Sequence, residues 1–300
     1  MKDLPFDRLT EALNRVGGGW ATPVAQKPDG AQARAGRVSH YRSSNGSRRA
    51  HIKVYLASTE DDDKEDIKQA SPERLARLKE RFEAITAHPE IAAVPILDMS
   101  LHEEALIVVM EQYTPLSQVF GAGTQLPDVR AANALRELNT NEEWLHFDIC
   151  PKNVAIDNEG RCFYLDLESV YLIGAGGADI STPMLKVHRT PEELRARLHK
   201  EIQSGGVVSR DLAVEFQNYQ LARLALEIHF DQSLVGHNPA HMRTQIPANV
   251  AQGEFPSCFD TFFADGTAPA PLVLATQLES VPSTSESAPS SAQSSVGDQA

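Results

Sequence analysis

The order of strand-like and helix-like stretches is the feature that most limits how this chain can fold. Stretches rich in β-branched residues come first, and after about residue 144 the chain is mostly helical, apart from two short strand-like runs. A doubly wound parallel sheet needs a regular alternation of strands and helices, which this sequence lacks. The sequence therefore predicts an α+β fold.

Four stretches carry the signals of a helix. Residues 3–16 have apolar side chains at three- and four-residue spacing, followed by the stop signal "GGG" (Phe6, Leu9, Leu13 and Val16). Residues 72–87 begin with a proline and place four apolar side chains on one face (Leu75, Leu78, Phe82 and Ile85). Two further helices are predicted at about 191–203 and 211–230.

The strand-like stretches are short and are separated by turn signals. "GRVSHYRSSNGSRRAHIKVYLAS" reads as a hairpin that turns through residues 43–46. "AAVPILDMS" and "EALIVVMEQY" are two further strand candidates. "NVAID" and "RCFYLD" predict a second hairpin, which turns through residues 158–160.

Composition excludes several classes of protein. The chain of 300 residues has 41% hydrophobic and 23% charged residues, as in an ordinary globular protein. Its net charge of −13 argues against a nucleic-acid or anionic-membrane binder, which needs clustered Lys and Arg. Without a long apolar run or a signal peptide, the expectation is a cytoplasmic protein with no membrane span. The three cysteines form no C-x-x-C pair, and the Ser/Pro-rich end is predicted to be disordered.

"WLHFDICPKNVAID", residues 144–157, concentrates hydrogen-bonding groups where a plain turn needs few. His146, Asp148 and Asn153 lie in this stretch, and Asp166 follows at the end of the next strand-like run. Carboxylate and carboxamide oxygens suit a hard cation such as Mg²⁺, so Asn153 and Asp166 are the predicted metal ligands. Asp148 would accept or orient the proton of an attacking hydroxyl.

This stretch resembles the catalytic loop of the protein-kinase fold, H-R-D-x-x-x-x-N, which is followed by the metal aspartate of D-F-G. Here "HFDICPKN" stands for the loop and Asp166-Leu167-Glu168 for D-F-G. "AHIKVYL" places Lys53 in a strand, as in the family's V-A-I-K. The resemblance spans most of the chain and implies two lobes: a small β-rich N-lobe at 21–112 and a larger helical C-lobe at 113–278. Residues 1–20 would then be a helical extension and residues 279–300 a disordered tail.

The resemblance implies ATP and Mg²⁺ as cofactors and a role for each matching residue. Lys53 would hold the α- and β-phosphates, with Glu80 as its ion-pair partner and Glu83 as a rival. Lys152 would steady the γ-phosphate beside the catalytic Asp148. The other nucleotide contacts would come from the phosphate loop, the cover over adenine and the hinge (Ala31, Ala33, Gly36, Val38, His51, Met110, Glu111 and Tyr113).

The chain departs from the family pattern at several positions. Phe147 replaces the arginine of H-R-D, and Ala31 and Ala33 replace two glycines of the phosphate loop. His51 stands where a small alanine covers adenine, and D-L-E is reminiscent of aminoglycoside and choline phosphotransferases. Residues 190–193, "TPEE", resemble the family's A-P-E but equally read as a capped helix start.

Three functions follow from this resemblance. The favoured one is an ATP-dependent kinase that acts on Ser or Thr hydroxyls of a protein substrate, supported by Lys152 in the P-K-N position. The second is a small-molecule kinase, supported by D-L-E. The third is a pseudokinase that serves as a binding or scaffold module, supported by His51 and the missing glycines.

Overall fold

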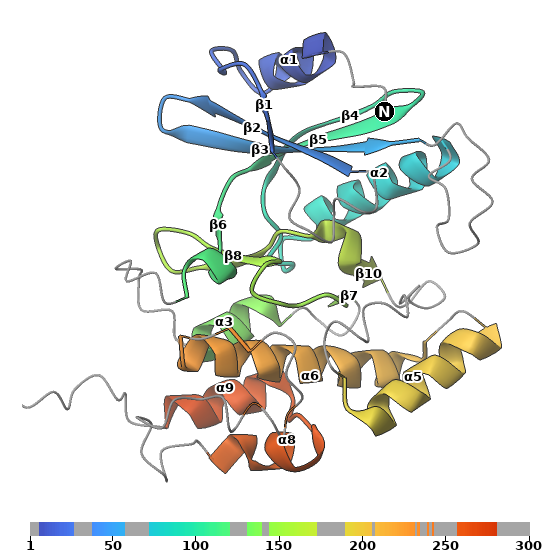
Figure 1. Ribbon diagram of the computed structural model, residues 1–300, viewed down its shortest axis with the longest axis vertical. Coiled ribbons are helices and arrows are strands. Elements are labelled where there is room, and N and C mark those ends of the chain that lie inside the picture. Colours follow the sequence, from blue (N-terminus) through green and yellow to red (C-terminus); the bar gives the residue numbers. More distant parts are fainter. Residues whose placement is uncertain are drawn as a thin grey trace, which may run out of the picture.

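The computed structural model describes residues 6–26, 38–57, 72–120, 131–139, 144–172, 190–205, 208–231, 233–234, 239, 242 and 257–280. Figure 1 shows a sheet with one helix above it and another below, followed along the longest axis by a mainly helical part. Strands precede most of the helices in the chain. The predicted α+β class is confirmed.

A five-stranded antiparallel sheet forms the first part, in the order β1-β2-β3-β5-β4. Its strands are β1 (Val24–Gln26), β2 (Val38–Asn45), β3 (Arg48–Leu56), β4 (Ile96–Leu101) and β5 (Ala105–Glu111). The predicted hairpin of β2 and β3 is confirmed, but its turn lies later than predicted. Because Asn45 pairs with Arg48, the loop has only Gly46 and Ser47. Gly46 has a φ of +60°, the conformation that the first position of such a tight loop requires.

Strand β5 divides the interior of the first part into two layers. Ala105, Ile107 and Val109 face one way and belong to the core under α1 (Phe6–Arg15). Leu106, Val108 and Met110 face the other way, into the core that includes α2 (Pro72–Ala87). Successive side chains of a strand point to opposite faces, so an uninterrupted apolar strand implies a covered sheet on both sides.

Helix α1 is a layer of this core. Leu9, Ala12 and Leu13 are buried against the sheet, and the helix ends before Gly17, which has a φ of +115°. The predicted apolar face was wrong at one position: Phe6 is 47% exposed, and Ala12 lies in the contact. A small side chain at Ala12 lets the helix approach the sheet closely.

The second part is built around α6 (Arg210–His229), whose residues from Leu212 onward are mostly buried. The helices around it are α3 (Ala131–Leu138), α5 (Glu192–Gly205), α8 (Asp260–Asp265) and α9 (Pro271–Glu279). Short 3₁₀ helices occur at η2 (Leu116–Gln118), η3 (Leu167–Ser169) and η5 (Ser257–Phe259). The helices predicted at 72–87, 191–203 and 211–230 are confirmed. Helix α5 begins at Glu192, one residue later than the helix-start interpretation of "TPEE" predicts, and the Pro191 carbonyl accepts its first backbone hydrogen bond, from Arg195.

Two small antiparallel sheets connect the parts. One joins β6 (Thr114–Pro115), β8 (Val154–Ile156) and β9 (Cys162–Tyr164), and the other joins β7 (Trp144–His146) to β10 (Val170–Leu172). The predicted turn of the β8–β9 hairpin is confirmed, with Gly160 at a φ of +83°. Asp157 closes this turn by accepting hydrogen bonds from the backbone N–H groups of Glu159 and Arg161, at 2.8 and 2.9 Å.

The last described helix, α9, reaches the first residue of the predicted tail. Glu279 is the last residue of α9, and its carboxylate forms an ion pair with Arg136 of α3. The phosphate-loop residues Ala31, Ala33 and Gly36 and most of the predicted tail lie outside the described residues. Within the described part, no helix is both long and apolar enough to cross a membrane.

We expect Leu9→Ala to lower the free energy of unfolding by about 2–5 kcal/mol, because Leu9 is fully buried between α1 and the sheet. Phe6→Ala on the same helix is the matched control, with an expected change within about 0.5 kcal/mol. Urea denaturation followed by circular dichroism measures both. Equal losses in the two variants would contradict the packing of α1 on the sheet.

Candidate functional site

The loop between β7 and β8 is anchored at its first residue, His146. The backbone N–H of His146 donates to Gln217 Oε1 at 2.7 Å, and its ring stacks on Tyr164 with 4.4 Å between ring centroids. The backbone N–H of Asp148 donates to His146 Nδ1 at 3.1 Å, so this nitrogen carries no proton. A buried imidazole therefore sets the direction of the chain at Asp148.

Asp148 and Asn153 are brought together at the centre of the loop. Asn153 Nδ2 donates to Asp148 Oδ2 at 2.8 Å and to the Asp148 carbonyl at 3.0 Å. The backbone of Asn153 accepts a hydrogen bond from Leu165 N–H at 2.9 Å, which ties the loop to the residue before Asp166. With its NH₂ group used by Asp148, Asn153 has its carboxamide oxygen as the group that a cation would bind.

Lys53 connects the five-stranded sheet to the second part of the structure. Its Nζ lies 2.9 Å from Asp166 Oδ1 and 3.3 Å from Glu168 Oε1. Tyr55, two residues further along β3 and on the same face, donates its hydroxyl to Glu168 Oε1 at 2.5 Å. Ser169 Oγ donates to the other oxygen of Asp166 at 3.2 Å. We call Lys53, Tyr55, Asp166 and Glu168 the lysine cluster.

The lysine cluster holds separated charges at neutral pH. Burial alone would raise the pKa of Asp166, but the Lys53 ammonium outweighs it and lowers that pKa to about 2. Burial likewise opposes a charged Lys53, but Asp166 and Glu168 outweigh it and raise the lysine pKa. The pKa of Glu168 is raised, first by burial and then by the neighbouring Asp166 carboxylate. Asp166 is therefore the more strongly ionised of the two acids.

The predicted partner of Lys53 requires a correction. Glu80 lies exposed on α2, and the carboxylates that contact Lys53 belong to Asp166 and Glu168. The rival Glu83 is also exposed and pairs with Lys79 on its own helix. The ion pair with Lys53 that was predicted for Glu80 is made by Glu168, the third residue of D-L-E.

A pair of histidines lies beside Lys53 on the same sheet face. His40 of β2 is the cross-strand neighbour of Lys53, and its Nδ1 lies 3.1 Å from Nε2 of His51. Burial, then the nearby Lys53, lowers the pKa of His51 to about 3, and the pKa of His40 is also lowered. Both rings are neutral at neutral pH. His51 is also the cross-strand neighbour of Met110, so two of the residues predicted to contact the nucleotide lie side by side.

The other predicted site residues are distributed around this face. Met110 is buried at the end of β5, and Glu111 and Tyr113 are half-buried after it, joined by a 3.3 Å hydrogen bond between their side chains. Val38 is half-buried at the start of β2, opposite Tyr55. Lys152 is exposed on the loop.

The sequence-based interpretation missed two glutamines of α6. Gln217 accepts from the backbone of His146, and Gln220 accepts from Ile149 N–H at 2.6 Å while donating to the Phe147 carbonyl at 3.1 Å. The signal in the sequence was present: Gln217 and Gln220 are three residues apart on one face of a helix, between buried apolar residues, and buried side chains of this kind need polar partners. These side chains hold the backbone on both sides of Asp148.

Cys150 lies within the same loop but is not a nucleophile at neutral pH. Burial raises the pKa of its thiol to about 12, and the Asp148 carboxylate adds to this effect. A protonated thiol is a poor nucleophile, and this one is half-buried. The predicted inert role of Cys150 fits this environment.

The oxygen donors of the loop fit a Mg²⁺ ion. Asp166 is ionised, and the Asn153 carboxamide oxygen comes from a side chain whose orientation is already set by Asp148. In the described residues, no three His, Cys, Asp or Glu side chains are grouped to hold a metal by themselves. Mg²⁺ commonly takes only one or two protein ligands and completes its shell with water and phosphate, so two ligands are sufficient.

Comparison with known proteins adds no family to this picture. No protein-family model and no curated protein sequence matches the chain. The assignment of a function therefore depends on the chemistry of the site.

We expect Gln220→Ala to lower the free energy of unfolding by about 1–3 kcal/mol, because it leaves the N–H of Ile149 and the carbonyl of Phe147 unpaired in a buried place. Gln277→Ala, on the exposed side of α9, is the control, with an expected change within about 0.5 kcal/mol. Chemical denaturation measures both. A Gln220→Ala protein as stable as its parent would show that α6 does not hold the loop.

Proposed function

We propose that this chain is an ATP-dependent phosphotransferase, with Ser or Thr hydroxyls of proteins as the favoured acceptors. The observation that carries the proposal is the contact of Lys53 Nζ with Asp166 Oδ1 at 2.9 Å, across 113 residues of sequence. The hydrogen-bonded Asp148 and Asn153 are separated from Asp166 along the chain by the β8–β9 hairpin. Phosphoryl transfer needs this set: a cation for phosphates, oxygen ligands for a metal, and a carboxylate for the acceptor hydroxyl.

Lys53 would contact the phosphates of ATP directly, and Asp166 would contact them through Mg²⁺. The ammonium of Lys53 is buried and positively charged, and it would attract the α- and β-phosphates of ATP. Asp166 and Asn153 would hold Mg²⁺, which supplies neutralisation of the phosphate charge when it is bound. The ion pair keeps both groups charged and oriented before the nucleotide enters, so little reorganisation is needed.

Asp148 would orient the acceptor hydroxyl. Its carboxylate is half-buried and is fixed from one side by the Asn153 amide at 2.8 Å. A carboxylate in this position accepts a hydrogen bond from a Ser or Thr hydroxyl and takes its proton as the phosphoryl group transfers. The exposed Lys152, four residues further on, would contribute positive charge near the γ-phosphate.

Glu168 would perform the task that the resemblance assigns to a helix glutamate. It contacts Lys53 at 3.3 Å and is held from the other side by the Tyr55 hydroxyl at 2.5 Å. Because Glu168 and Asp166 are carried by the same short 3₁₀ turn, the two carboxylates approach Lys53 together. The position of α2 is then not required for the ion pair.

A non-catalytic nucleotide-binding or scaffold module is the second candidate. The observation that favours it is the His40–His51 contact at 3.1 Å, which fills the sheet face beside Lys53 with two rings. A larger ring in place of the small alanine of the resemblance would crowd adenine. Binding of ATP without phosphoryl transfer is the result that distinguishes this candidate from a kinase.

Asp148→Asn should lower the rate of phosphoryl transfer at least about 100-fold, because the amide keeps the shape but cannot take a proton. ATP affinity should stay the same, since Asp148 is assigned to the acceptor. Labelled ATP with a mixture of Ser- and Thr-containing peptides measures the rate, and a mixture of amino-sugars and choline tests small-molecule acceptors. Asp260→Asn, on the exposed start of α8, is the control.

The parent protein decides between the candidates in this experiment. Transfer to peptides supports the proposed kinase, and transfer to the small molecules alone supports the second type of kinase. ATP binding without any transfer supports the non-catalytic module. Full activity of the Asp148→Asn protein would contradict the role of Asp148.

Glu168→Gln should weaken the binding of Mg²⁺-ATP about tenfold, equivalent to about 1.4 kcal/mol, because it removes a charge that orients Lys53. Glu80→Gln is the matched control and should change the dissociation constant less than about twofold, since Glu80 is exposed. Isothermal titration calorimetry measures both. The opposite order of the two effects would restore Glu80 as the partner of Lys53.

A further inference from the structure

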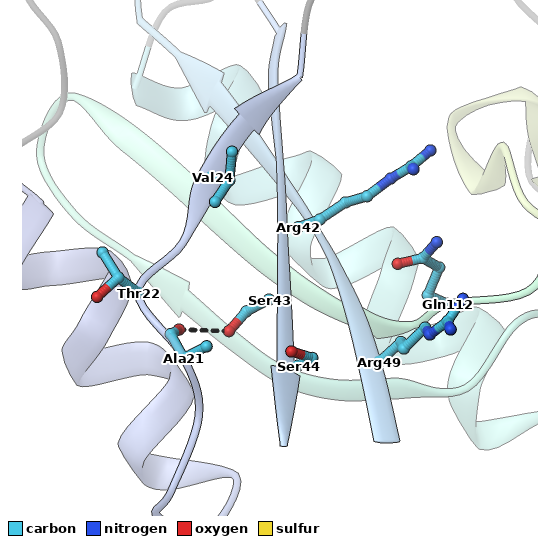
Figure 2. Close-up of a pocket in the computed structure, with 8 residues that line it drawn as sticks. All are labelled: Ala21, Thr22, Val24, Arg42, Ser43, Ser44, Arg49 and Gln112. Carbon is cyan, nitrogen blue, oxygen red and sulfur yellow. Dashed lines mark hydrogen bonds between the residues drawn. The ribbon is translucent and has the colours of Figure 1, made fainter. Parts of the chain in front are cut away.

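A pocket lies at the end of the sheet, and none of the four residues of the lysine cluster lines it. It has a volume of about 290 Å³ and is lined by residues of the segment before β1, of β1, β2 and β3, and of the segment after β5 (Ala21, Thr22, Val24, Arg42, Ser43, Ser44, Arg49 and Gln112). Figure 2 shows Arg42 and Arg49 on neighbouring strands, with Gln112 between them and Val24 on the adjacent β1. None of the eight residues has a role in the proposed reaction.

The register places the two arginines on one face of the sheet. Val24 pairs with Arg42, and Ser44 pairs with Arg49. Cross-strand partners and residues two apart share a face, so these four side chains are on the same side. Arg42 is also the cross-strand neighbour of His51, so the pocket lies next to the histidine pair.

The charge of this pocket is unlike that of the rest of the chain. Acidic residues outnumber basic ones by 41 to 28 in the whole sequence, but residues 30–59 contain six Lys or Arg and no Asp or Glu. No acidic side chain lines the pocket. Within the described part, Arg15, Arg136, Arg161 and Arg197 form ion pairs, whereas neither Arg42 nor Arg49 pairs with an acid. Two guanidinium groups without counter-charges attract an anion.

The remaining polar groups suit an oxyanion. Thr22 and Ser44 offer hydroxyl donors and Gln112 offers an amide donor. Ser43 is different, because its hydroxyl donates to the Ala21 carbonyl at 2.5 Å and so holds the segment before β1 against β2. That contact fixes the rim of the pocket. A phosphoryl group, with a charge of about −1.5 to −2 and three acceptor oxygens, matches two arginines and two hydroxyls.

The neighbouring strand indicates that the phosphoryl group is carried by an extended peptide. In the described residues β1 is the edge strand of the sheet, with β2 on one side only. Val24 is 65% exposed beside it. A peptide that paired with β1 would lie about 4.8 Å from that strand, and a side chain opposite Val24 would share the face of Arg42. Edge strands bind peptides in this way, through backbone hydrogen bonds and pockets for alternate side chains.

We propose that this pocket binds a phosphorylated Ser or Thr side chain of an extended peptide that pairs with the edge of β1. Arg42, on the strand next to β1, binds the phosphoryl oxygens, Arg49 on the following strand adds positive charge to the same face, and Val24 contacts the peptide. The proposal does not depend on phosphotransferase activity, because binding can be measured without ATP. The net charge of −13 opposes the alternative partner, a nucleic acid.

The test is a fluorescence anisotropy titration of the full chain with a short fluorescein-labelled peptide of Thr and Val residues around one phosphoserine. The unphosphorylated peptide, a version with Glu in place of phosphoserine, and a labelled single-stranded DNA are titrated in parallel. We expect saturable binding of the phosphopeptide, at least about tenfold tighter than that of the other three probes. Inorganic phosphate should compete for the pocket only at much higher concentration, since it lacks the strand.

Matched variants locate the binding site. Arg42→Gln with Arg49→Gln should weaken phosphopeptide binding at least about tenfold, whereas Arg48→Gln should change it less than about twofold. Arg48 is the control because it is the neighbour of Arg49 in β3, but its guanidinium lies 5.3 Å from the centroid of the Trp20 ring instead of in the pocket. Val24→Glu places a negative charge beside the pocket, so it should also abolish phosphopeptide binding. Because Val24 is exposed, this substitution should not unfold the protein.

Each remaining outcome overturns the proposal. No phosphopeptide binding up to about 1 mM would show that the pocket is not a site. Equal binding of the Glu peptide would show that the pocket does not recognise a phosphoryl group. Equal binding of DNA would show that the surface binds anions in general. An equal loss in Arg48→Gln would place binding elsewhere on the hairpin.

Discussion

The contact of Lys53 with Asp166 and Glu168 is the interaction on which the arrangement of the site depends. Strand β3 sends Ile52 and Val54 into the apolar core under α1, so the alternating residues Lys53 and Tyr55 must face the second part of the structure. An ammonium that is only 8% exposed requires carboxylate partners to remain charged. The carboxylates of D-L-E provide them. The same electrostatic requirement therefore joins the two parts and assembles the groups assigned to phosphate and metal.

The loop between β7 and β8 depends on a different kind of support. Its backbone lacks regular hydrogen bonding around Asp148, and α6 supplies the missing partners through Gln217 and Gln220. Buried polar groups that are fully paired specify one geometry, because any displacement leaves a donor or acceptor unsatisfied. The position of Asp148 is thus set by a helix that begins more than 60 residues later in the chain. Precise placement of this carboxylate is what proton transfer to it would require.

Sequence patterns predicted four of the helices and the two hairpins, but they predicted neither helices α3, α8 and α9 nor the contacts between elements. The helix at 72–87 and the turn at 158–160 follow from local signals, an initial proline and a glycine that adopts a positive φ. The exposed Glu80 shows the limit, because helical periodicity does not tell which of several glutamates will meet a lysine on a strand. Glu168 meets it through a turn whose geometry depends on the contact of Ser169 with Asp166. The pairing of Gln217 and Gln220 with the loop is likewise a property of the tertiary structure.

Phe147 holds the loop through apolar packing. In kinases with arginine before the catalytic aspartate, a phosphorylated segment neutralises that charge and orders the loop. Here the ring is fully buried, with centroids 6.2 Å from Phe216 and 5.5 Å from Tyr171. There is no charge to neutralise, and the apolar contacts exist without modification. Since α6 also pairs with the backbone on both sides of Asp148, we expect the loop to keep this geometry without a phosphate on a neighbouring segment.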